Sequence, residues 1–296
     1  MNYIKNSICF GEILWDIFPN EKKIGGAPLN IALRLESLGV KSLIVSQIGA
    51  DSLGQNLIHK IEKKINTKLI SVSKDFPTGK VKVEIDNNGD ANYSIEYPSA
   101  WDKIKNSSTL KKEVSKTDLF IYGSLACRDL VSRKTLLNLL QYSKFKVLDV
   151  NLRPPHYDFS TIEMLMINAD FIKFNDDELL IISKKIGSNF KTIEENIKYI
   201  SEKTKTKKIC VTKGDKGAVL FVNNKFYSHN GFKINVVDTV GSGDSFLAVL
   251  ITEILNNTSP EKSLEKACAV GAIVAKEKGA NPKITNEEIN SFINTK

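Results

Sequence analysis

The chain has only 4 cysteines, and no two of them form a C-x-x-C pair. Cys9 and Cys210 lie in apolar, strand-like runs, which is typical of reduced, packed thiols. No apolar stretch is long enough to cross a bilayer, and the N-terminal residues lack the apolar segment and small-residue cleavage site of a signal peptide. These absences predict a cytoplasmic protein that is neither exported nor embedded in a membrane.

Internal repeats, low-complexity tracts and Pro- or Ser-rich linkers are also absent, so nothing divides the 296 residues into two full domains. A Walker A motif, G-x-x-x-x-G-K-[S/T], and an early G-x-G-x-x-G are missing, which weakens P-loop and dinucleotide interpretations. Lys and Arg exceed Asp and Glu by 42 − 34 = 8, but the lysines are scattered and local runs have no interleaved aromatics. We therefore expect a solvated surface and no nucleic-acid partner.

Short apolar runs recur along the chain, separated by amphipathic stretches: SICF, SLIVSQIG, DLFIYG, FKVLDVN, DFIKFN and KKICVTKG. Runs this continuous predict one doubly wound α/β domain, with a mostly parallel sheet covered by helices on both faces. The segment Thr78–Asp102 instead alternates strictly around Asn88-Gly89, which predicts a β-hairpin. From its spacing alone, this hairpin is either a plain surface feature or a lid over a site.

The stretch VVDTVGSGDSF, Val236–Phe246, places glycines beside carboxylates. The preceding FKINVVD predicts a strand and the following SFLAVLITEILNN a helix, so Gly241 and Gly243 lie at a predicted strand-to-helix junction. Free amides and the positive end of a helix dipole bind anions there. Asp244 would repel a phosphate unless it accepts a proton from an attacking hydroxyl while those amides hold the developing charge. The plain alternative is a helix N-cap with glycines for turning.

A second glycine pair, Gly25 and Gly26, precedes a predicted helix that ends before Gly39. Asn30 lies in its first turn, and Asp16 ends the first predicted strand region. An amide and a carboxylate beside glycines can hydrogen-bond sugar hydroxyls. A glycine turn and a surface Asn are the plain alternatives.

The loops FNDDE and VTKGDKG follow two predicted strands. Because the carboxyl ends of parallel strands meet at one edge of a sheet, these loops and DTVGSGD are expected to share one ligand.

Together these residues resemble the ribokinase-like (PfkB-type) carbohydrate kinase family. GGAPLNIALRLESLGVKSLIVSQIGADSLG is similar to its N-terminal signature, and DTVGSGDSF to its C-terminal D-T-x-G-A-G-D signature, with Ser242 where Ala is usual. DVNLR, NDDE, VTKGDKG and KGANP follow in family order. GEILWDIFP, YGSLACR and PSAWD look most like the fructokinase branch.

The resemblance implies a single three-layer α/β/α domain over residues 1–296, with a small β lid formed by about 12–24 and 78–102. It implies transfer of the γ-phosphate of ATP to a sugar hydroxyl, with fructose as the sugar and fructose 6-phosphate as the product. In this reaction Asp244 would be the general base and Gly241–Gly243 the anion hole. 2-Keto-3-deoxygluconate, ribose and nucleoside kinases of the same family are the alternatives. A non-catalytic nucleotide or sugar sensor is the rival from another class.

The same resemblance implies a role for each matching residue. Arg153 would reach the transferring phosphate or the sugar, and Ser242 would belong to the catalytic loop. The implied sugar-binding residues are Asp16, Gly25, Gly26, Asn30 and Asp244. The implied nucleotide-binding residues are Asn175, Glu178, Thr212, Gly214, Gly217, Gly241, Gly243 and Cys268. Glu178 would hold Mg²⁺ through water, and a monovalent cation such as K⁺, whose requirement stays open, would be held by Asp238, Val240, Val274 and Gly279. Lids of this family often pair between subunits, so a homodimer is expected.

Overall fold

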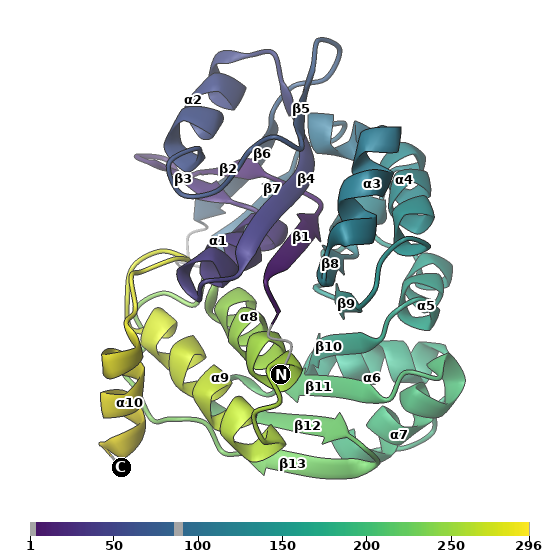
Figure 1. The fold of residues 1–296 in the computed structure, drawn as a ribbon, viewed down its shortest axis with the longest axis vertical. Coiled ribbons are helices and arrows are strands. Elements are labelled where there is room, and N and C mark those ends of the chain that lie inside the picture. Colours follow the sequence, from purple (N-terminus) through teal and green to yellow (C-terminus); the bar gives the residue numbers. More distant parts are fainter. Residues whose placement is uncertain (1–3, 86–90, 296) are drawn as a thin grey trace.

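A nine-stranded sheet forms the centre of the computed structural model, which describes residues 4–85 and 91–295 (Figure 1). Its strands lie in the order β13-β12-β11-β10-β9-β8-β1-β4-β5. The strands are β1 (Asn6–Phe10), β4 (Lys41–Gly49), β5 (Ile70–Ser73), β8 (Leu119–Gly123), β9 (Lys146–Asp149), β10 (Phe171–Asn175), β11 (Lys208–Thr212), β12 (Ala218–Val222) and β13 (Lys225–His229). Neighbours from β5 to β11 are parallel, whereas β12 and β13 continue the sheet antiparallel. The predicted mostly parallel sheet is therefore confirmed.

Alternate residues of the strands face opposite layers of helices, as the pleat of a strand requires. In β1, Cys9 packs into one layer, and its neighbours Ile8 and Phe10 pack into the other. The first layer contains α1 (Ala27–Ser37), α2 (Ser52–Ile61), α8 (Ser242–Leu255), α9 (Pro260–Ala275) and α10 (Asn286–Asn294). The second contains α3 (Ser108–Lys116), α4 (Leu130–Leu140), α5 (Phe159–Ile167), α6 (Asp176–Lys185) and α7 (Ile193–Thr204). The implied three-layer arrangement is confirmed.

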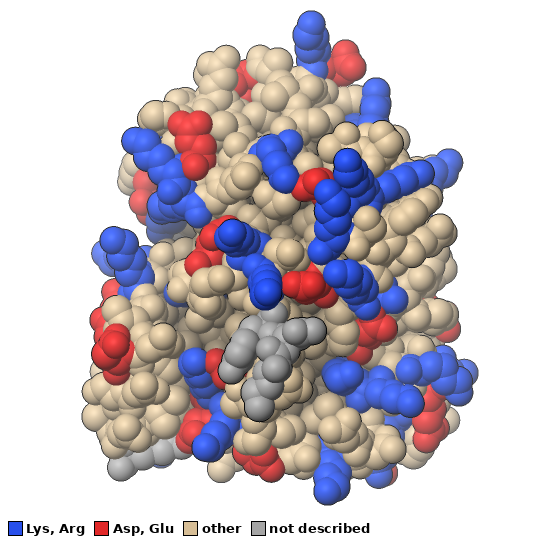
Figure 2. Space-filling view, viewed as in Figure 1, with Lys and Arg blue, Asp and Glu red and all other residues tan. Residues whose placement is uncertain are grey.

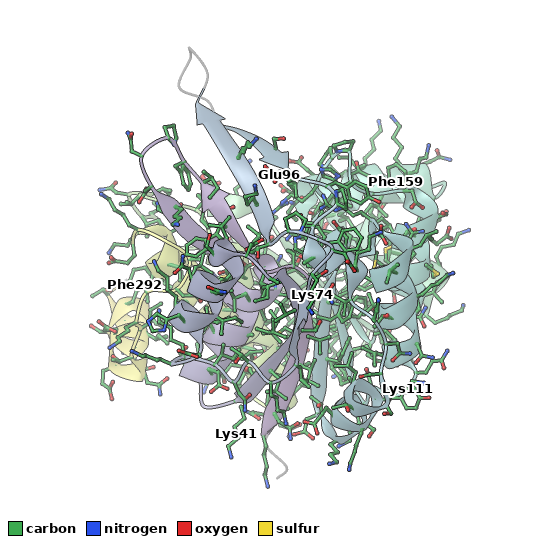
Figure 3. All side chains as sticks on the ribbon, turned by 90° about the horizontal axis from the view of Figure 1, so that it is seen from above. Lys41, Lys74, Glu96, Lys111, Phe159 and Phe292 are labelled. Atoms are coloured by element: carbon green, nitrogen blue, oxygen red, sulfur yellow. The ribbon has the colours of Figure 1, made fainter. Side chains whose placement is uncertain are left out.

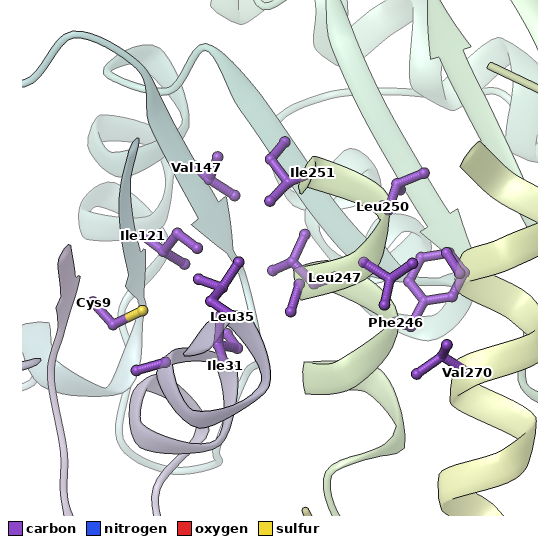
Figure 4. Packing of buried hydrophobic residues seen from close by; sticks show 14 of the residues in the cluster. Cys9, Ile31, Leu35, Ile121, Val147, Phe246, Leu247, Leu250, Ile251 and Val270 are labelled. Atoms are coloured by element: carbon purple, nitrogen blue, oxygen red, sulfur yellow. The ribbon is translucent and has the colours of Figure 1, made fainter. Parts of the chain in front are cut away.

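The first layer fixes α1 beside α8. Figure 4 shows Ile31 and Leu35 of α1 close to Leu247 of α8, with Ile121 of the sheet nearby, and all four side chains are buried. Buried apolar side chains of this size each contribute about 1.5–3 kcal/mol to folding. The contact holds the N-terminal ends of two helices from opposite ends of the sequence in a fixed relation.

A second, four-stranded sheet lies at one end of the first and has the order β3-β2-β6-β7. Its strands are β2 (Leu14–Ile17), β3 (Lys22–Gly25), β6 (Gly79–Ile85) and β7 (Ala91–Ile95), so two hairpins join through the parallel pair β2 and β6. Figure 3 shows the β6–β7 hairpin projecting from the body of the molecule. The predicted hairpin is confirmed, although Asn88-Gly89 lies outside the described residues.

Two sequence predictions are corrected by the fold. Asp16 does not end the first strand of the main sheet, because β1 stops at Phe10, Gly11 turns with φ 144°, and Asp16 lies in β2 of the second sheet. The segment 232–238 is not a strand. Its last two amides donate to the carbonyl of Ala275 at the end of α9 instead of pairing with β13, and Val236 remains 59% exposed.

The surface and the cysteines complete the description of the fold. In Figure 2, Lys and Arg side chains are spread over the face shown and interleaved with Asp and Glu. All four cysteines are buried thiols, and none of them is part of a disulfide. Within residues 4–85 and 91–295, no helix combines the length and apolarity that a membrane span requires.

Candidate active site

The glycine-rich loop ends at the N-terminus of α8, and its geometry depends on contacts with neighbouring segments. Gly241 is the N-cap with φ 76°, and a Cβ there would lie 2.5 Å from Cα of Ala280. The Ser242 hydroxyl donates to the carbonyl of Gly271 in α9 at 2.9 Å. Amides in the first turn of a helix have no partner within the helix, so those of Gly243 and Asp244 can bind an anion.

Asp244 lies in this first turn and is partly buried. Its Oδ2 accepts a hydrogen bond of 2.8 Å from Nδ2 of Asn30 in α1. Burial, followed by the nearby charge of Asp149, raises its pKa to about 6, while Asn30, Lys173 and Arg153 act in the opposite direction. A carboxylate with this pKa is ionised at neutral pH and is a better proton acceptor than an ordinary aspartate.

Two of the predicted sugar-binding residues, Asp16 and Gly25, lie on neighbouring strands of the second sheet, and Asn30 lies in α1, which follows that sheet directly. A Cβ on Gly25 would lie 2.2 Å from Oδ2 of Asp16, so glycine is what allows the Asp16 carboxylate to occupy this place. Burial raises the pKa of Asp16 to about 6, and the charges of Arg153 and Lys23 oppose this rise. Because Arg153 also lowers the pKa of Asp244, the exposed guanidinium lies within electrostatic reach of both carboxyl groups.

A third carboxyl group, Glu12, borders this region and was missed by the sequence analysis. Its side chain is 4% exposed, and one carboxyl oxygen, Oε2, has no hydrogen-bond partner in the described part of the chain. Burial raises its pKa to about 7, and Arg153 and the amide of Ala27 oppose this. A Cβ on Gly26, whose φ is 112°, would lie 2.4 Å from the Glu12 carbonyl oxygen. An acid inside the apolar run CFGEILW was the signal for it.

A cavity of about 780 Å³ is lined by five of the predicted nucleotide-binding residues and by Ser242 of the predicted catalytic loop. The five are Thr212, Gly214, Gly217, Gly243 and Cys268, whereas Asn175, Glu178 and Gly241 are not among the lining residues. Val236 and Phe246 add apolar surface, and the volume is that of a ligand pocket. Gly217 has φ 78°, and a Cβ there would lie 1.9 Å from the His229 carbonyl oxygen, so the wall is built by close backbone approach.

Asn175 and Glu178 form a reciprocal cap at the start of α6. Oδ1 of Asn175 accepts from the Glu178 amide at 2.7 Å, and Oε2 of Glu178 accepts from the Asn175 amide at 2.8 Å. Oε1 of Glu178 accepts from the Leu152 amide at 2.8 Å, which ties the cap to the DVNLR loop. Burial raises the pKa of Glu178. The nucleotide-binding role that the sequence analysis assigned to these two residues stays a prediction.

The fit of Mg²⁺ follows from this donor set. Within the described ranges, no group of three or more His, Cys, Asp or Glu side chains could hold a metal. Mg²⁺ commonly keeps several waters and binds through one or two carboxylates plus substrate phosphates. Each Glu178 oxygen retains a lone pair beside its amide partner, so Glu178 suits contact through water and not a closed cage.

A buried ion pair, also missed by the sequence analysis, lies between the two sides of the site. Nζ of Lys173 donates to Oδ1 of Asp149 at 2.8 Å, and both residues are buried. Burial would lower the pKa of Lys173, but Asp149, Glu178 and Asp244 raise it overall. A Cβ on Gly243 would lie 3.7 Å from this ammonium, so the ammonium lies close to the predicted anion hole. A lysine inside the apolar run DFIKF was the available signal.

Asp238 holds the loop before α8 against the turn after α9. Its Oδ1 accepts from the Val240 amide at 3.0 Å and its Oδ2 from the Gly279 amide at 3.1 Å. The monovalent-cation site proposed for Asp238, Val240, Val274 and Gly279 stays a prediction.

Taken together, the arrangement places a carboxylate of raised pKa beside free helix-terminal amides, with hydrogen-bonding groups on one side and a large cavity on the other. A hydroxyl held on the first side can lose its proton to Asp244 while an anionic group from the cavity rests on the amides.

Comparison with known proteins gives the family of the chain. Residues 5–287 match the family described as pfkB family carbohydrate kinase. Probable fructokinase-6, chloroplastic, of Arabidopsis thaliana is 26% identical over 311 residues, covering 95% of this chain and 80% of the relative. Fructokinase-2 of Oryza sativa subsp. japonica is 27% identical over 307 residues, covering 94% and 90%.

Solved structures share the fold. Fructokinase with bound ATP from Xylella fastidiosa has a TM-score of 0.86 at 20% identity, covering 97% of this chain and 98% of that one. An uncharacterized sugar kinase from Pyrococcus horikoshii has a TM-score of 0.80 at 25% identity, covering 93% of each.

Proposed function

The chain belongs to the pfkB family of carbohydrate kinases, and from this premise we propose that it transfers the γ-phosphate of ATP to fructose, giving fructose 6-phosphate. The observation that carries the proposal is the position of Asp244 in the first turn of α8, where its carboxylate accepts a hydrogen bond from Asn30 and the preceding residue, Gly243, lines the large cavity. Fructose is chosen because curated relatives that span most of the chain are fructokinases.

In this proposal each side chain acts by a physical effect already described. Asp244 accepts the proton of the sugar 6-hydroxyl as that oxygen attacks phosphorus. At the end of the Gly241–Gly243 loop, the free amides of Gly243 and Asp244, together with the charge of Arg153, stabilise the negative charge on the transferring group. Asp16 and Asn30 orient the sugar. Mg²⁺, held by the phosphates and through water by Glu178, supplies charge neutralisation when bound.

The second sheet is proposed to act as a lid over the acceptor. Asp16 in β2 pairs in register with Val81 in β6, so the two side chains lie on one face of this sheet. Closure would exclude water from the phosphoryl group and suppress ATP hydrolysis. Deletion of 81–95 should raise the ratio of ATP hydrolysis to sugar phosphorylation, and an unchanged ratio would contradict a lid. The homodimer expected through this sheet stays a prediction.

The proposal is tested with purified protein, ATP and Mg²⁺ against fructose, ribose, 2-keto-3-deoxygluconate and a nucleoside. ADP release gives kcat/KM for each acceptor, and ³¹P NMR of the product gives the phosphorylated position. The expected result is the highest kcat/KM for fructose with phosphate on the 6-oxygen. Turnover of another acceptor without turnover of fructose would show that fructose is not the substrate. A fructose 1-phosphate product would show that the 6-hydroxyl is not the position phosphorylated.

A further inference from the structure

A second side-chain amide, that of Asn281, stands behind the contact between Asn30 and Asp244. Nδ2 of Asn281 donates to Oδ1 of Asn30 at 3.0 Å, and Nδ2 of Asn30 donates to Oδ2 of Asp244 at 2.8 Å. A side-chain amide has a donor end and an acceptor end. The three residues therefore form a hydrogen-bonded chain with one direction, which ends on the carboxylate.

The direction of this chain matters because an ionised carboxylate only accepts hydrogen bonds. If the Asn30 amide were reversed, its oxygen would face Asp244, and two acceptors would repel each other unless Asp244 carried a proton. With Asn281 donating to Oδ1 of Asn30, the reversed Asn30 would also set two donors against each other. The present direction thus matches an ionised Asp244, and the opposite direction matches a protonated one.

Asn281 is also the last residue of this hydrogen-bonded series, because its side-chain oxygen accepts no hydrogen bond from another described residue. Its Oδ1 is buried and has no hydrogen-bond partner among residues 4–85 and 91–295. A buried oxygen without a partner costs about 1–3 kcal/mol, so this amide contributes less to stability than a fully bonded one. Its donor end, directed at Asn30, is the part that the structure uses.

The turn that carries Asn281 is fixed on both sides. Before it, the Gly279 amide donates to Asp238 at 3.1 Å. After it, the Pro282 carbonyl accepts from Nη2 of Arg34 at 3.1 Å. Nε of the same buried arginine donates to the hydroxyl of Ser245, the residue after Asp244, at 3.0 Å. The turn, α1 and the start of α8 are thus tied together, which holds Asn281 at a set distance from the base.

We propose that Asn281 is a positioning residue for this reaction: it fixes the amide of Asn30 with the NH₂ group toward Asp244, which keeps the base ionised and directed at the acceptor hydroxyl. This inference rests on the proposed function of Asp244. Asn281 acts through Asn30 and need not contact either substrate.

Other charged and titratable groups also act on Asp244 and must be kept constant in a test. They come from β1 and the segment after it, from β9 and the loop after it, and from β10: Cys9, Glu12, Asp149, Arg153 and Lys173. Substitutions at Asn281 leave all of them in place. Because Asn281→Leu adds no charge, a change in the titration of the base in that variant reports on the amide chain, whereas Asn281→Asp also adds a like charge near Asp244.

The experiment compares Asn281→Leu, Asn281→Asp and the matched control Asn286→Leu, which removes an exposed amide from the start of α10. The kcat/KM for the acceptor is measured from about pH 5 to about pH 9 at saturating ATP and Mg²⁺, because this ratio reports ionisations of the enzyme before the acceptor binds. Asn281→Leu should shift the acid limb upward by roughly 0.5–1 pH unit, since Asn30 loses its polarising donor.

Asn281→Asp should shift the limb further than Asn281→Leu. Its carboxylate accepts only, so it favours the reversed Asn30 amide, whose oxygen faces Asp244. The KM for ATP and the profile of Asn286→Leu should match the wild type. Superimposed profiles for the wild type and both Asn281 variants would overturn the proposal, as would equal shifts in the control.

Failure of this inference and failure of the proposed function are separable in the same assay. If Asp244→Asn turns over acceptor like the wild type, the assigned base is wrong and the proposed function fails. If Asp244→Asn is inactive while the Asn281 profiles superimpose on the wild type, only the positioning role fails.

A measurement on the wild-type protein covers the case in which an Asn281 variant unfolds. The ¹H–¹⁵N signals of the Asn30 side-chain NH₂, assigned by their loss in Asn30→Asp, should titrate together with the acid limb. Asn30 signals that do not change across that limb would contradict the proposal.

Discussion

The two sides of the site are built from different materials. The proposed nucleotide side, a cavity of about 780 Å³, is shaped by backbone approach at positions such as Gly217 and by apolar side chains. The proposed acceptor side gathers three carboxyl groups whose pKa values burial raises: Glu12 to about 7, and Asp16 and Asp244 to about 6. The first side depends on the shape of its wall, and the second depends on the ionisation state of its carboxyl groups.

This difference predicts which side responds to added bulk and which side responds to the removal of charge. Backbone amides carry no titratable proton, so the nucleotide side should respond to added bulk and little to pH. Carboxyl groups in a poorly solvated place are costly to ionise, so the acceptor side should respond to pH and to removal of charge. Each substitution on one side is therefore compared with a control substitution elsewhere.

The largest effect is expected from Asp244→Asn. The amide keeps the shape of the carboxylate and can still accept from Asn30, but it cannot take a proton, so kcat should fall about 10²–10⁴-fold while ATP binding persists. Asp215→Asn, on the wall of the cavity, should leave kcat close to the wild type. Steady-state kinetics and ATP titration check both. Equal losses of kcat in the two variants would contradict the claim that the proton acceptor is Asp244 and not an acid of the cavity wall.

A smaller effect is expected from Gly241→Ala. Its φ of 76° and a Cβ position 2.5 Å from Cα of Ala280 mean that the loop before Asp244 must move. A displacement of about 1 Å near the chemistry can cost up to ~10²-fold in rate. Gly39→Ala is the matched control, because Gly39 has φ 82° and open space around it. The control should lose stability of about 1–2 kcal/mol and keep kcat. Equal kcat in the two variants would show that the loop tolerates the shift.

Much of this comparison could be predicted from the sequence, because periodicity and short motifs report on local structure. The continuous runs around Ile121 and Cys210 predicted buried parallel strands, and the glycines around Asp244 predicted the helix-terminal site. The segment 232–238 was predicted wrongly, since its alternation serves contacts with α9 and the cavity, and not a strand. Alternation marks where apolar side chains recur, but it shows neither what they contact nor how far they are buried, and Val236 is 59% exposed.

The parts that the sequence analysis missed depend on contacts between distant segments. Asn281 meets Asn30 from 251 positions away, and the pair of Lys173 and Asp149 spans two strands. A single charge in an apolar run, as at Glu12, signals a buried acid but not its neighbours. Such pairings follow from the topology of the sheet, which composition and spacing fix only in outline.

The next prediction concerns the pH dependence of the acceptor side. Asp244 must be ionised to accept a proton, and its pKa is raised to about 6, first by burial. The kcat/KM should therefore be level above about pH 7 and fall about tenfold per unit as pH drops well below 6. ATP binding to the nucleotide side, measured without acceptor, should change much less over this range. A level rate down to about pH 4 would contradict the raised pKa or the role of Asp244.

The smallest effect is on stability, and its sign separates an acid whose pKa is raised by burial from one whose pKa is lowered by hydrogen bonds. The folded pKa of Glu12, about 7, lies above the value of an unfolded glutamate, so the stability it contributes at low pH is lost as pH rises through 7. Glu12→Gln should therefore raise the free energy of unfolding by about 1–3 kcal/mol near pH 8, and by little near pH 4. Urea unfolding at both pH values measures the difference.

Asp51→Asn gives the opposite sign and completes this comparison. Burial would raise the pKa of Asp51, but hydrogen bonds from Thr78 and Gly54 lower it overall. Its stabilising contribution is present above the unfolded pKa of about 3.9 and is lost as pH falls through the lower folded value. The variant should therefore lose about 1 kcal/mol near pH 8 and less in acid. If both variants shifted stability in the same direction near pH 8, the contrast between the two kinds of carboxyl group would fail.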